Sequence, residues 1–163
     1  MDFDKRLQDA IERGQRRHER TAQDAQRKAL SLDELKQLHS RHRLKISEHI
    51  ETCVGRLPQH FPGFQYETIY GDRGWGAGCS RDDLKLSRGG GRETNFSRLE
   101  LTVRPFSSIQ VVDLAGKGTI RNKEVFNRNY YEKIEEADVA KFLELVDAWT
   151  LEFAELYAAR GEA

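Results

Sequence analysis

The hydrophobic periodicity of this chain changes twice, and that change limits the possible folds more than any other feature of the sequence. Apolar residues recur at helical spacing up to residue 57, at alternate positions between residues 64 and 112, and at helical spacing again from residue 139. The chain has 163 residues, enough for one domain of ordinary size with an appended arm. We therefore expect an α+β fold: two N-terminal helices, an antiparallel meander sheet of four to five strands, and a C-terminal amphipathic helix packed on one sheet face.

Residues 1–30 are expected to form a helical arm. The segment has no proline and is rich in Arg, Gln, Ala and Glu, which favour helix. Its first apolar residues recur at helical spacing, but after Gly14 the same face carries only small or polar residues. These first apolar residues are Phe3, Leu7, Ala10 and Ile11. The stripe is too thin for a core, so the arm either stays solvated, packs on the next helix, or packs on a second copy of the chain.

Residues 31–163 are expected to form a single α+β domain that starts with a second helix. Ser31 and Glu34 have the spacing of a capping box, in which the serine caps a backbone N–H and the glutamate reaches back. Pro58 disfavours continuation of the helix beyond the preceding residue. The second helix is therefore expected over residues 32–57.

The sheet is expected over residues 64–125. Four glycine- or proline-containing stretches are expected to break it into strands: 71–78, 88–94, Pro105 with its neighbours, and 115–118. Cys79–Ser87 and Thr119–Val125 are counted as weaker strands. The final helix is expected over residues 137–159, with Trp149 in the core because it lies in the middle of the apolar stripe.

Three histidines and one cysteine lie on or beside the core-facing stripe of the second helix: His39, His42, His49 and Cys53. His39 with His42, or His49 with Cys53, could each supply two ligands to a metal. His49 and Cys53 could also form an imidazole–thiol pair. No second ligand pair accompanies them in the sequence, and the last turn of a helix disfavours a thiolate. We therefore expect half-buried imidazoles, and we assign no metal, no cofactor and no catalytic residue.

The glycine-rich segment 71–78 is similar to a phosphate-binding loop only in its glycine content. It lies between two expected strands, so no helix N-terminus is available to hold an anion. We expect a flexible hairpin with an exposed Trp75 at its tip, which is either a contact residue or the plug of a local gap, and Arg73 and Trp75 are therefore candidate surface contacts. Cys79 follows this loop and is a candidate reactive thiol, because Arg73 and Arg81 favour a thiolate. The alternative for Cys79 is an ordinary strand residue.

Four basic residues are candidates for an anion site at one end of the sheet. In a meander, successive turns alternate between the two ends, so the stretches 88–94 and 115–118 are expected at the same end. The four residues are Arg88, Arg92, Lys117 and Arg121. Their side chains and the glycine N–H groups beside them could bind a phosphate or a carboxylate. The alternative is a set of solvated surface charges.

The charge balance and the apolar runs of the sequence exclude some partners. Lys plus Arg and Asp plus Glu both total 27, so the chain lacks the basic excess typical of nucleic-acid and membrane-surface binders. It has no apolar run long enough to span a membrane, no signal-peptide pattern and only two cysteines, so we expect a cytoplasmic location. Acidic residues of the final helix are expected on a solvated face, or alternatively on a docking surface for a basic partner: Glu144, Asp147, Glu152 and Glu155.

The favoured function is that of a small interaction or regulatory domain, and not an enzyme, that acts through protein surfaces and self-associates through its N-terminal helix. The first alternative is a small-molecule or anion-binding protein, including an enzyme, that uses the glycine-rich loops of the sheet. The second is nucleic-acid binding through the basic segments 88–92 and 13–20. A protein partner, a second copy of the chain, or an acidic or phosphorylated ligand is thus expected in preference to nucleic acid or a membrane.

Overall fold

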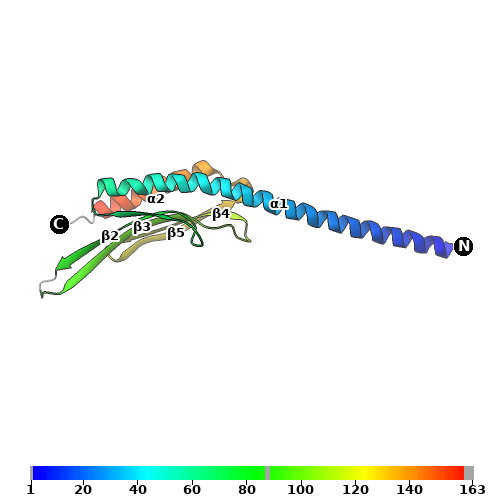
Figure 1. Cartoon of the computed structure of the whole chain (residues 1–163), viewed down its shortest axis with the longest axis horizontal. Helices are drawn as coiled ribbons and strands as arrows, with labels where there is room; N and C mark the ends of the chain where they lie inside the picture. The colour runs from blue at the N-terminus through cyan, green and yellow to red at the C-terminus, as the bar shows by residue number, and fades with distance from the viewer. Residues whose placement is uncertain (1, 87–88, 160–163) are drawn as a thin grey trace. The chain divides into compact units, whose positions relative to one another are not determined.

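The computed structural model describes residues 2–86 and 89–159, without the side chains at 28–30, 85–86 and 93. In chain order the elements are α1 (Asp2–His60), β1 (Gln65–Ile69), β2 (Trp75–Leu86), β3 (Arg92–Val103), β4 (Val111–Ile120), β5 (Lys123–Lys133), a short 3-10 helix (Ile134–Glu136) and α2 (Val139–Ala159), as Figure 1 shows. The chain divides into two units, Met1–Gln37 and Leu38–Ala163. Among the described residues, no helix is long and apolar enough to cross a membrane.

The two helices expected at the N-terminus are joined as one, α1, and the predicted break at Ser31 is absent. A capping box is a local signal, and a serine inside a helix costs only about 0.5 kcal/mol relative to alanine. The good helix formers on both sides therefore carry the helix through this position. The helix also runs past its predicted end at residue 57, and Pro58 lies in its last turn, where Phe61 N donates to Leu57 O at 2.8 Å.

The five strands form one antiparallel sheet in the order β1-β2-β3-β4-β5, which confirms the meander. The sheet continues to Lys133 instead of residue 125, because the aromatic stretch after Val125 belongs to β5. β2 begins at Trp75, so the second half of the predicted loop 71–78 is strand.

The turn predicted at 115–118 is wrong, because these residues lie within β4. The turn is formed instead by Arg121 and Asn122, whose positive φ values of 47° and 71° fit a tight hairpin between β4 and β5. This turn also divides the predicted strand Thr119–Val125. A glycine is required at position 116 because there is no room for a side chain, and not because the chain turns there: a Cβ at this position would lie 2.6 Å from the ring of Trp149.

The core of the second unit lies between one face of the sheet and two helices. Residues 38–60 of α1 and the whole of α2 lie on this same face, as Figure 1 shows. The buried helical residues include Ile46, Ile50 and Val54 of α1 and Phe142, Val146, Trp149 and Phe153 of α2. Leu99, Leu101 and Val103 of β3 and Val112 and Leu114 of β4 are buried below them. The amphipathic C-terminal helix and the core position of Trp149 are therefore confirmed.

Candidate functional site

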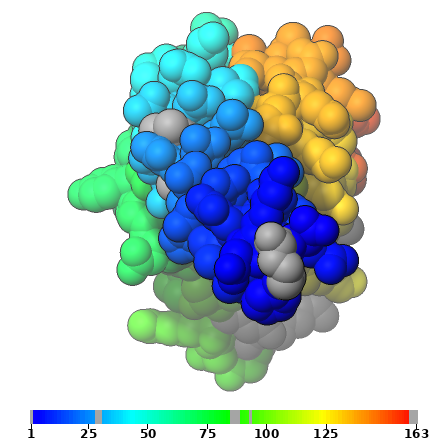
Figure 2. All heavy atoms as spheres, turned by 90° about the vertical axis from the view of Figure 1, so that its right-hand side faces the viewer, coloured from blue at the N-terminus to red at the C-terminus, as the bar shows by residue number. Residues whose placement is uncertain are grey.

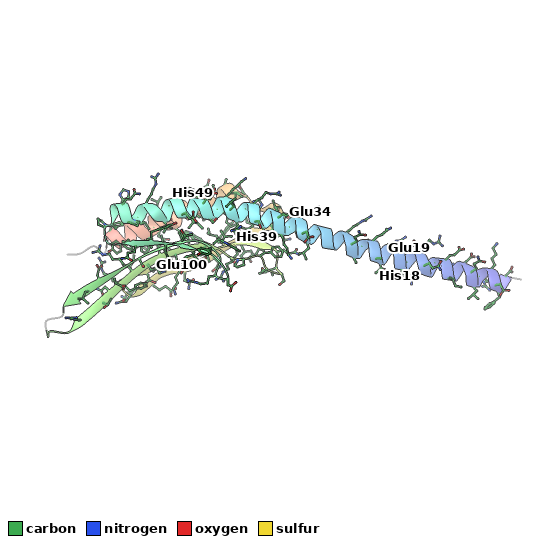
Figure 3. The ribbon with its side chains drawn as sticks, viewed as in Figure 1. His18, Glu19, Glu34, His39, His49 and Glu100 are labelled. Atoms are coloured by element: carbon green, nitrogen blue, oxygen red, sulfur yellow. The ribbon has the colours of Figure 1, made fainter. Side chains whose placement is uncertain are left out.

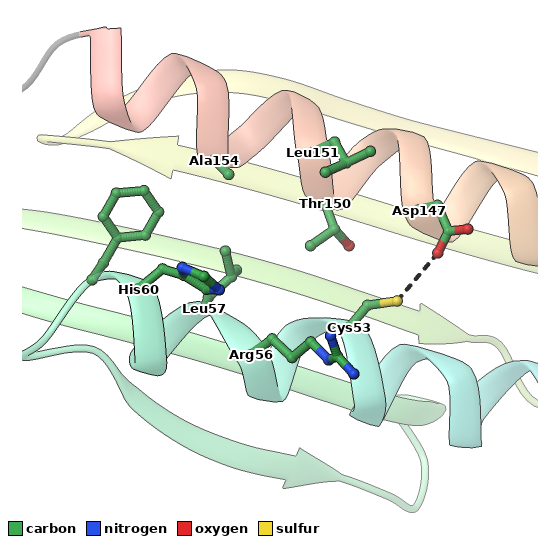
Figure 4. A pocket seen from close by; sticks show the side chains of 9 residues that line it. Cys53, Arg56, Leu57, His60, Asp147, Thr150, Leu151 and Ala154 are labelled. Carbon is green, nitrogen blue, oxygen red and sulfur yellow. Dashed lines mark hydrogen bonds between the residues drawn. The ribbon is translucent and has the colours of Figure 1, made fainter.

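A groove of about 540 Å³ lies between the end of α1 and α2 (Figure 4). Its walls are largely apolar, but a thiol, a guanidinium, an imidazole and a carboxylate also line it. The lining residues are Cys53, Arg56, Leu57, His60 and Phe61 from α1 and the residue that follows it, and Asp147, Thr150, Leu151 and Ala154 from α2.

Three potential ligand side chains meet beside this groove, and we call them the donor trio: His49, Cys53 and Asp147. His49 and Cys53 lie one turn apart on the same face of α1 because their spacing is i, i+4. Asp147 comes from α2 and accepts a hydrogen bond from the Cys53 thiol at 3.3 Å. Its Oδ1 lies 2.7 Å from His49 Nε2, and Cys53 Sγ lies 3.5 Å from the same nitrogen. The donor trio thus places a nitrogen, a sulfur and an oxygen around one point.

The donor trio does not have the geometry of a nucleophilic triad. In such a triad the acid and the nucleophile address different nitrogens of the imidazole, whereas here both lie at Nε2 of His49. Burial, followed by the hydrogen bond and the negative charge of Asp147, raises the pKa of the Cys53 thiol to about 11, against a smaller opposing effect of Arg56. The Cys53 thiol is therefore protonated at neutral pH.

Sequence reasoning identified two members of the donor trio and missed the third. Asp147 was expected on a solvated face, and its side chain is indeed 52% exposed. It lies at the edge of that face, next to α1, and this position depends on how α2 packs against α1. No local pattern reports such a contact between residues 94 positions apart.

Two further histidines of the second unit, His39 and His42, lie away from the donor trio and belong to no cluster of three potential ligands among the described residues. His39 is buried, its ring meets Phe106 edge-on with centroids 5.8 Å apart, and its Nε2 has no hydrogen-bond partner in the described part of the chain. Burial lowers the pKa of His39, as do the charges of Arg43 and His42, while the Arg104 backbone has the opposite effect. Burial also lowers the pKa of His42. Figure 3 shows His39 and His49 well apart along α1.

The two predicted surface contacts, Arg73 and Trp75, take part in the fold. Trp75 is half-buried at the start of β2, where the Arg43 guanidinium lies 4.1 Å from the centroid of its ring. The expectation of an exposed Trp75 at the tip of a flexible loop is therefore corrected: the residue is a strand terminus covered by an arginine. Arg73, in the preceding turn, is exposed and pairs with Glu100 at 2.5 Å.

Cys79 lies in the middle of β2 and is fully buried. Burial raises the pKa of its thiol to about 12, and the opposing effects of the Leu99 backbone and of Arg98 are smaller. The two arginines invoked for a thiolate do not act as expected: Arg73 pairs with Glu100 and Arg81 with Asp83. This environment favours the alternative, an ordinary core residue.

The three described residues of the predicted anion site are not gathered in one place. Arg92 is exposed at the start of β3, whereas Lys117 lies in mid-β4 opposite Glu100. At about 3.4 Å per residue, Arg92 and Glu100 are about 27 Å apart along β3. Arg121 is in the turn after β4, with its guanidinium 5.2 Å from the centroid of the Tyr157 ring. Arg88 lies outside the described residues.

The sheet face that carries no helix has its own shallow depression, of about 310 Å³. It brings Lys117 together with Arg73 and Arg104, around Glu100. Carboxylates already pair with both guanidinium groups: Glu100 with Arg73 at 2.5 Å, and Asp113 with Arg104 at 3.7 Å. This neutralisation weakens the case for an anion site on the sheet.

The described part of the first unit, residues 2–37, is helical, and three apolar side chains near its start are exposed. Phe3, Leu7 and Ile11 are 60%, 49% and 52% exposed. The first residues of α1, dark blue in Figure 2, face the viewer there.

No family model, curated protein or solved structure matches this chain. Its function must therefore be inferred from its own residues.

Proposed function

We propose that this chain is an interaction module that self-associates through its first unit, the helical arm. The observation that carries the proposal is the row of exposed apolar side chains at every fourth residue of α1: Phe3, Leu7 and Ile11. Such a row on one helix face is costly in water and is typical of a surface that packs against another helix. A second copy of the chain is the one partner that is always present with the arm.

The charge pattern of the arm favours an antiparallel pair. Residues 2–12 carry more acidic than basic side chains: Asp2, Asp4, Asp9 and Glu12 against Lys5 and Arg6. Residues 13–20 carry the reverse excess: Arg13, Arg16, Arg17 and Arg20 against Glu19. Two arms in parallel would place like charges side by side, whereas an antiparallel pair places each acidic half beside a basic half.

The sizes of the side chains support the same orientation. We place the two-fold axis of the pair between Glu12 and Arg13, because the change of charge falls there. Each bulky apolar residue then lies opposite a smaller or polar one: Phe3 opposite Ala22, Leu7 opposite His18, and Ile11 opposite Gly14. Large residues that face small ones allow two helices to approach closely.

The first experiment changes the apolar row and measures mass. Light scattering on the full chain should give the mass of a dimer, and the triple variant Phe3→Gln, Leu7→Gln, Ile11→Gln should give that of a monomer. A matched control makes the same change at three exposed apolar residues of the second unit, Leu44, Leu84 and Ile109. The control should remain a dimer. A monomeric full chain across the micromolar range, or a dimeric arm variant, would overturn the proposal.

A paired substitution tests the orientation separately. In the antiparallel pair Leu7 lies opposite His18, so Leu7→Glu should shift the equilibrium toward monomer because it places an unpaired carboxylate in the apolar row. Adding His18→Arg should restore the dimer, because the carboxylate then faces a guanidinium of the other copy. If the second change does not restore the dimer but the triple variant is still a monomer, the chain self-associates through the arm but not in the antiparallel arrangement.

A further inference from the structure

We propose that the donor trio, His49, Cys53 and Asp147, is a binding site for a divalent transition-metal ion of the zinc type. The proposal is independent of the arm, because all three residues belong to the second unit. It rests on the convergence of three different donor atoms from two helices beside an open groove.

The distances within the donor trio fit three corners of a tetrahedral zinc site. Zinc–ligand bonds of about 2.3 Å to sulfur and about 2.1 Å to nitrogen or oxygen give tetrahedral edges of about 3.6 Å for pairs with sulfur and about 3.4 Å for nitrogen with oxygen. Here the edges with Cys53 Sγ are 3.5 Å to His49 Nε2 and 3.3 Å to Asp147 Oδ1. The third edge, from His49 to Asp147, is 2.7 Å. Only this edge has to widen noticeably, and the half-exposed carboxylate of Asp147 can move.

The donor types select the class of ion. A thiolate and an imidazole nitrogen are preferred ligands of Zn²⁺ and of its neighbours in the transition series, whereas Mg²⁺ and Ca²⁺ require mostly oxygen ligands. Asp147 supplies one oxygen, too few for either of the latter ions. On binding, Cys53 releases its thiol proton to solvent as the metal–sulfur bond forms, and His49 donates the lone pair of a neutral Nε2.

Among the described residues that line the groove, the only further side chain of a usual zinc-ligand type is His60. It is seven residues after Cys53, about 10.5 Å further along the helix axis, too far to take the fourth coordination position. A bound ion would therefore keep a water molecule or take a ligand from outside the chain. Its main effect on the protein would be to clamp α1 to α2.

The test uses the full chain and Zn²⁺ itself. Calorimetric titration with zinc chloride should give one ion per chain, and magnesium chloride should give no heat of binding. Cys53→Ser and Asp147→Asn should each weaken zinc binding more than tenfold. Two matched controls should leave it unchanged: His60→Gln, which removes a neighbouring imidazole, and Glu144→Gln, which removes another carboxylate of α2 one turn from Asp147.

Two further measurements report on the metal site directly in the unmodified chain. Co²⁺ in place of Zn²⁺ should produce a sulfur-to-cobalt charge-transfer band and the visible absorption of a tetrahedral centre, both absent in Cys53→Ser. In the unmodified chain, Zn²⁺ should slow alkylation of Cys53 by iodoacetamide at least tenfold. An absence of zinc binding, binding that survives Cys53→Ser unchanged, or unprotected alkylation would each overturn the proposal.

Discussion

Replacing Gly116 by alanine tests the packing of α2 on the sheet. The added Cβ would lie 2.6 Å from Cε3 of Trp149 and 2.9 Å from Cδ2 of Leu101, about 1 Å inside ordinary carbon–carbon contact. Both neighbours are buried, so neither can rotate into solvent. Overpacking of this kind lowers the free energy of unfolding by about 1–3 kcal/mol. Alanine also reduces the conformational freedom of the unfolded chain, which offsets about 0.4–1 kcal/mol of this loss. The expected net loss in the free energy of unfolding is about 1–2 kcal/mol.

Urea denaturation followed by far-ultraviolet circular dichroism measures this loss without relying on tryptophan fluorescence. Gly118→Ala provides a graded comparison, because its Cβ would meet the Phe126 ring at 3.0 Å and Val125 Cγ2 at 3.2 Å, both looser than the contacts at Gly116, and should cost less. Trp149→Phe removes part of the large ring, so Gly116→Ala should cost at least about 1 kcal/mol less in that background. A Gly116→Ala protein as stable as the unmodified chain, or an equal cost in both backgrounds, would refute the assignment of Gly116 as space for Trp149.

Three further predictions concern single side chains. Burial holds the pKa of His39 below 6.5, so the folded chain binds fewer protons than the unfolded one, and the free energy of unfolding falls as the pH drops through about 6.5. His39→Phe should reduce the slope of this free energy against pH by up to about 1.4 kcal/mol per pH unit, and an unchanged slope would contradict the burial of a neutral His39. Asn122 has a φ of 71°, and its side chain accepts a hydrogen bond from Phe96 N and donates one to Thr94 O. The free energy of unfolding from urea titration should fall by about 2 kcal/mol in Asn122→Ala and by about half that in Asn122→Gly, which keeps the positive φ; equal losses would mean that the positive φ contributes nothing. Cys79 should resist thiol reagents in folded Cys53→Ser protein and react only on unfolding, so mass spectrometry that finds early modification would disprove its burial.

The fold class was predictable because periodicity reports which residues face the core. The alternation of Leu99, Leu101 and Val103 specifies a strand with one buried face, and the stripe through Val146 and Trp149 specifies a helix. These signals are repeated over many residues, so no single exception changes them.

The positions of turns were less predictable, because one residue type serves two purposes. Glycine marks a turn where φ is positive and also allows a large ring to approach a strand. Gly116 serves the second purpose, and only the position of Trp149 reveals it. The true turn at Arg121 and Asn122 contains no glycine and gave a weaker signal.

The candidate site was the least predictable part. Its two α1 members share a helix face and could be found by spacing, whereas Asp147 becomes a neighbour only when α2 returns to α1 at the end of the chain. A contact of this kind is a property of the tertiary structure.

The meander also has a consequence for the order of folding. Each strand pairs with its neighbour in sequence, so the sheet can grow by successive hairpins with little loop-closure entropy. The contact of α2 with α1 instead joins residues 98 positions apart, from His49 to Asp147, and closes a loop that spans most of the second unit. This closure is expected late on the folding path and early on the unfolding path. Any contact or ion that holds the two helices together there should therefore slow unfolding while it leaves the folding rate nearly unchanged.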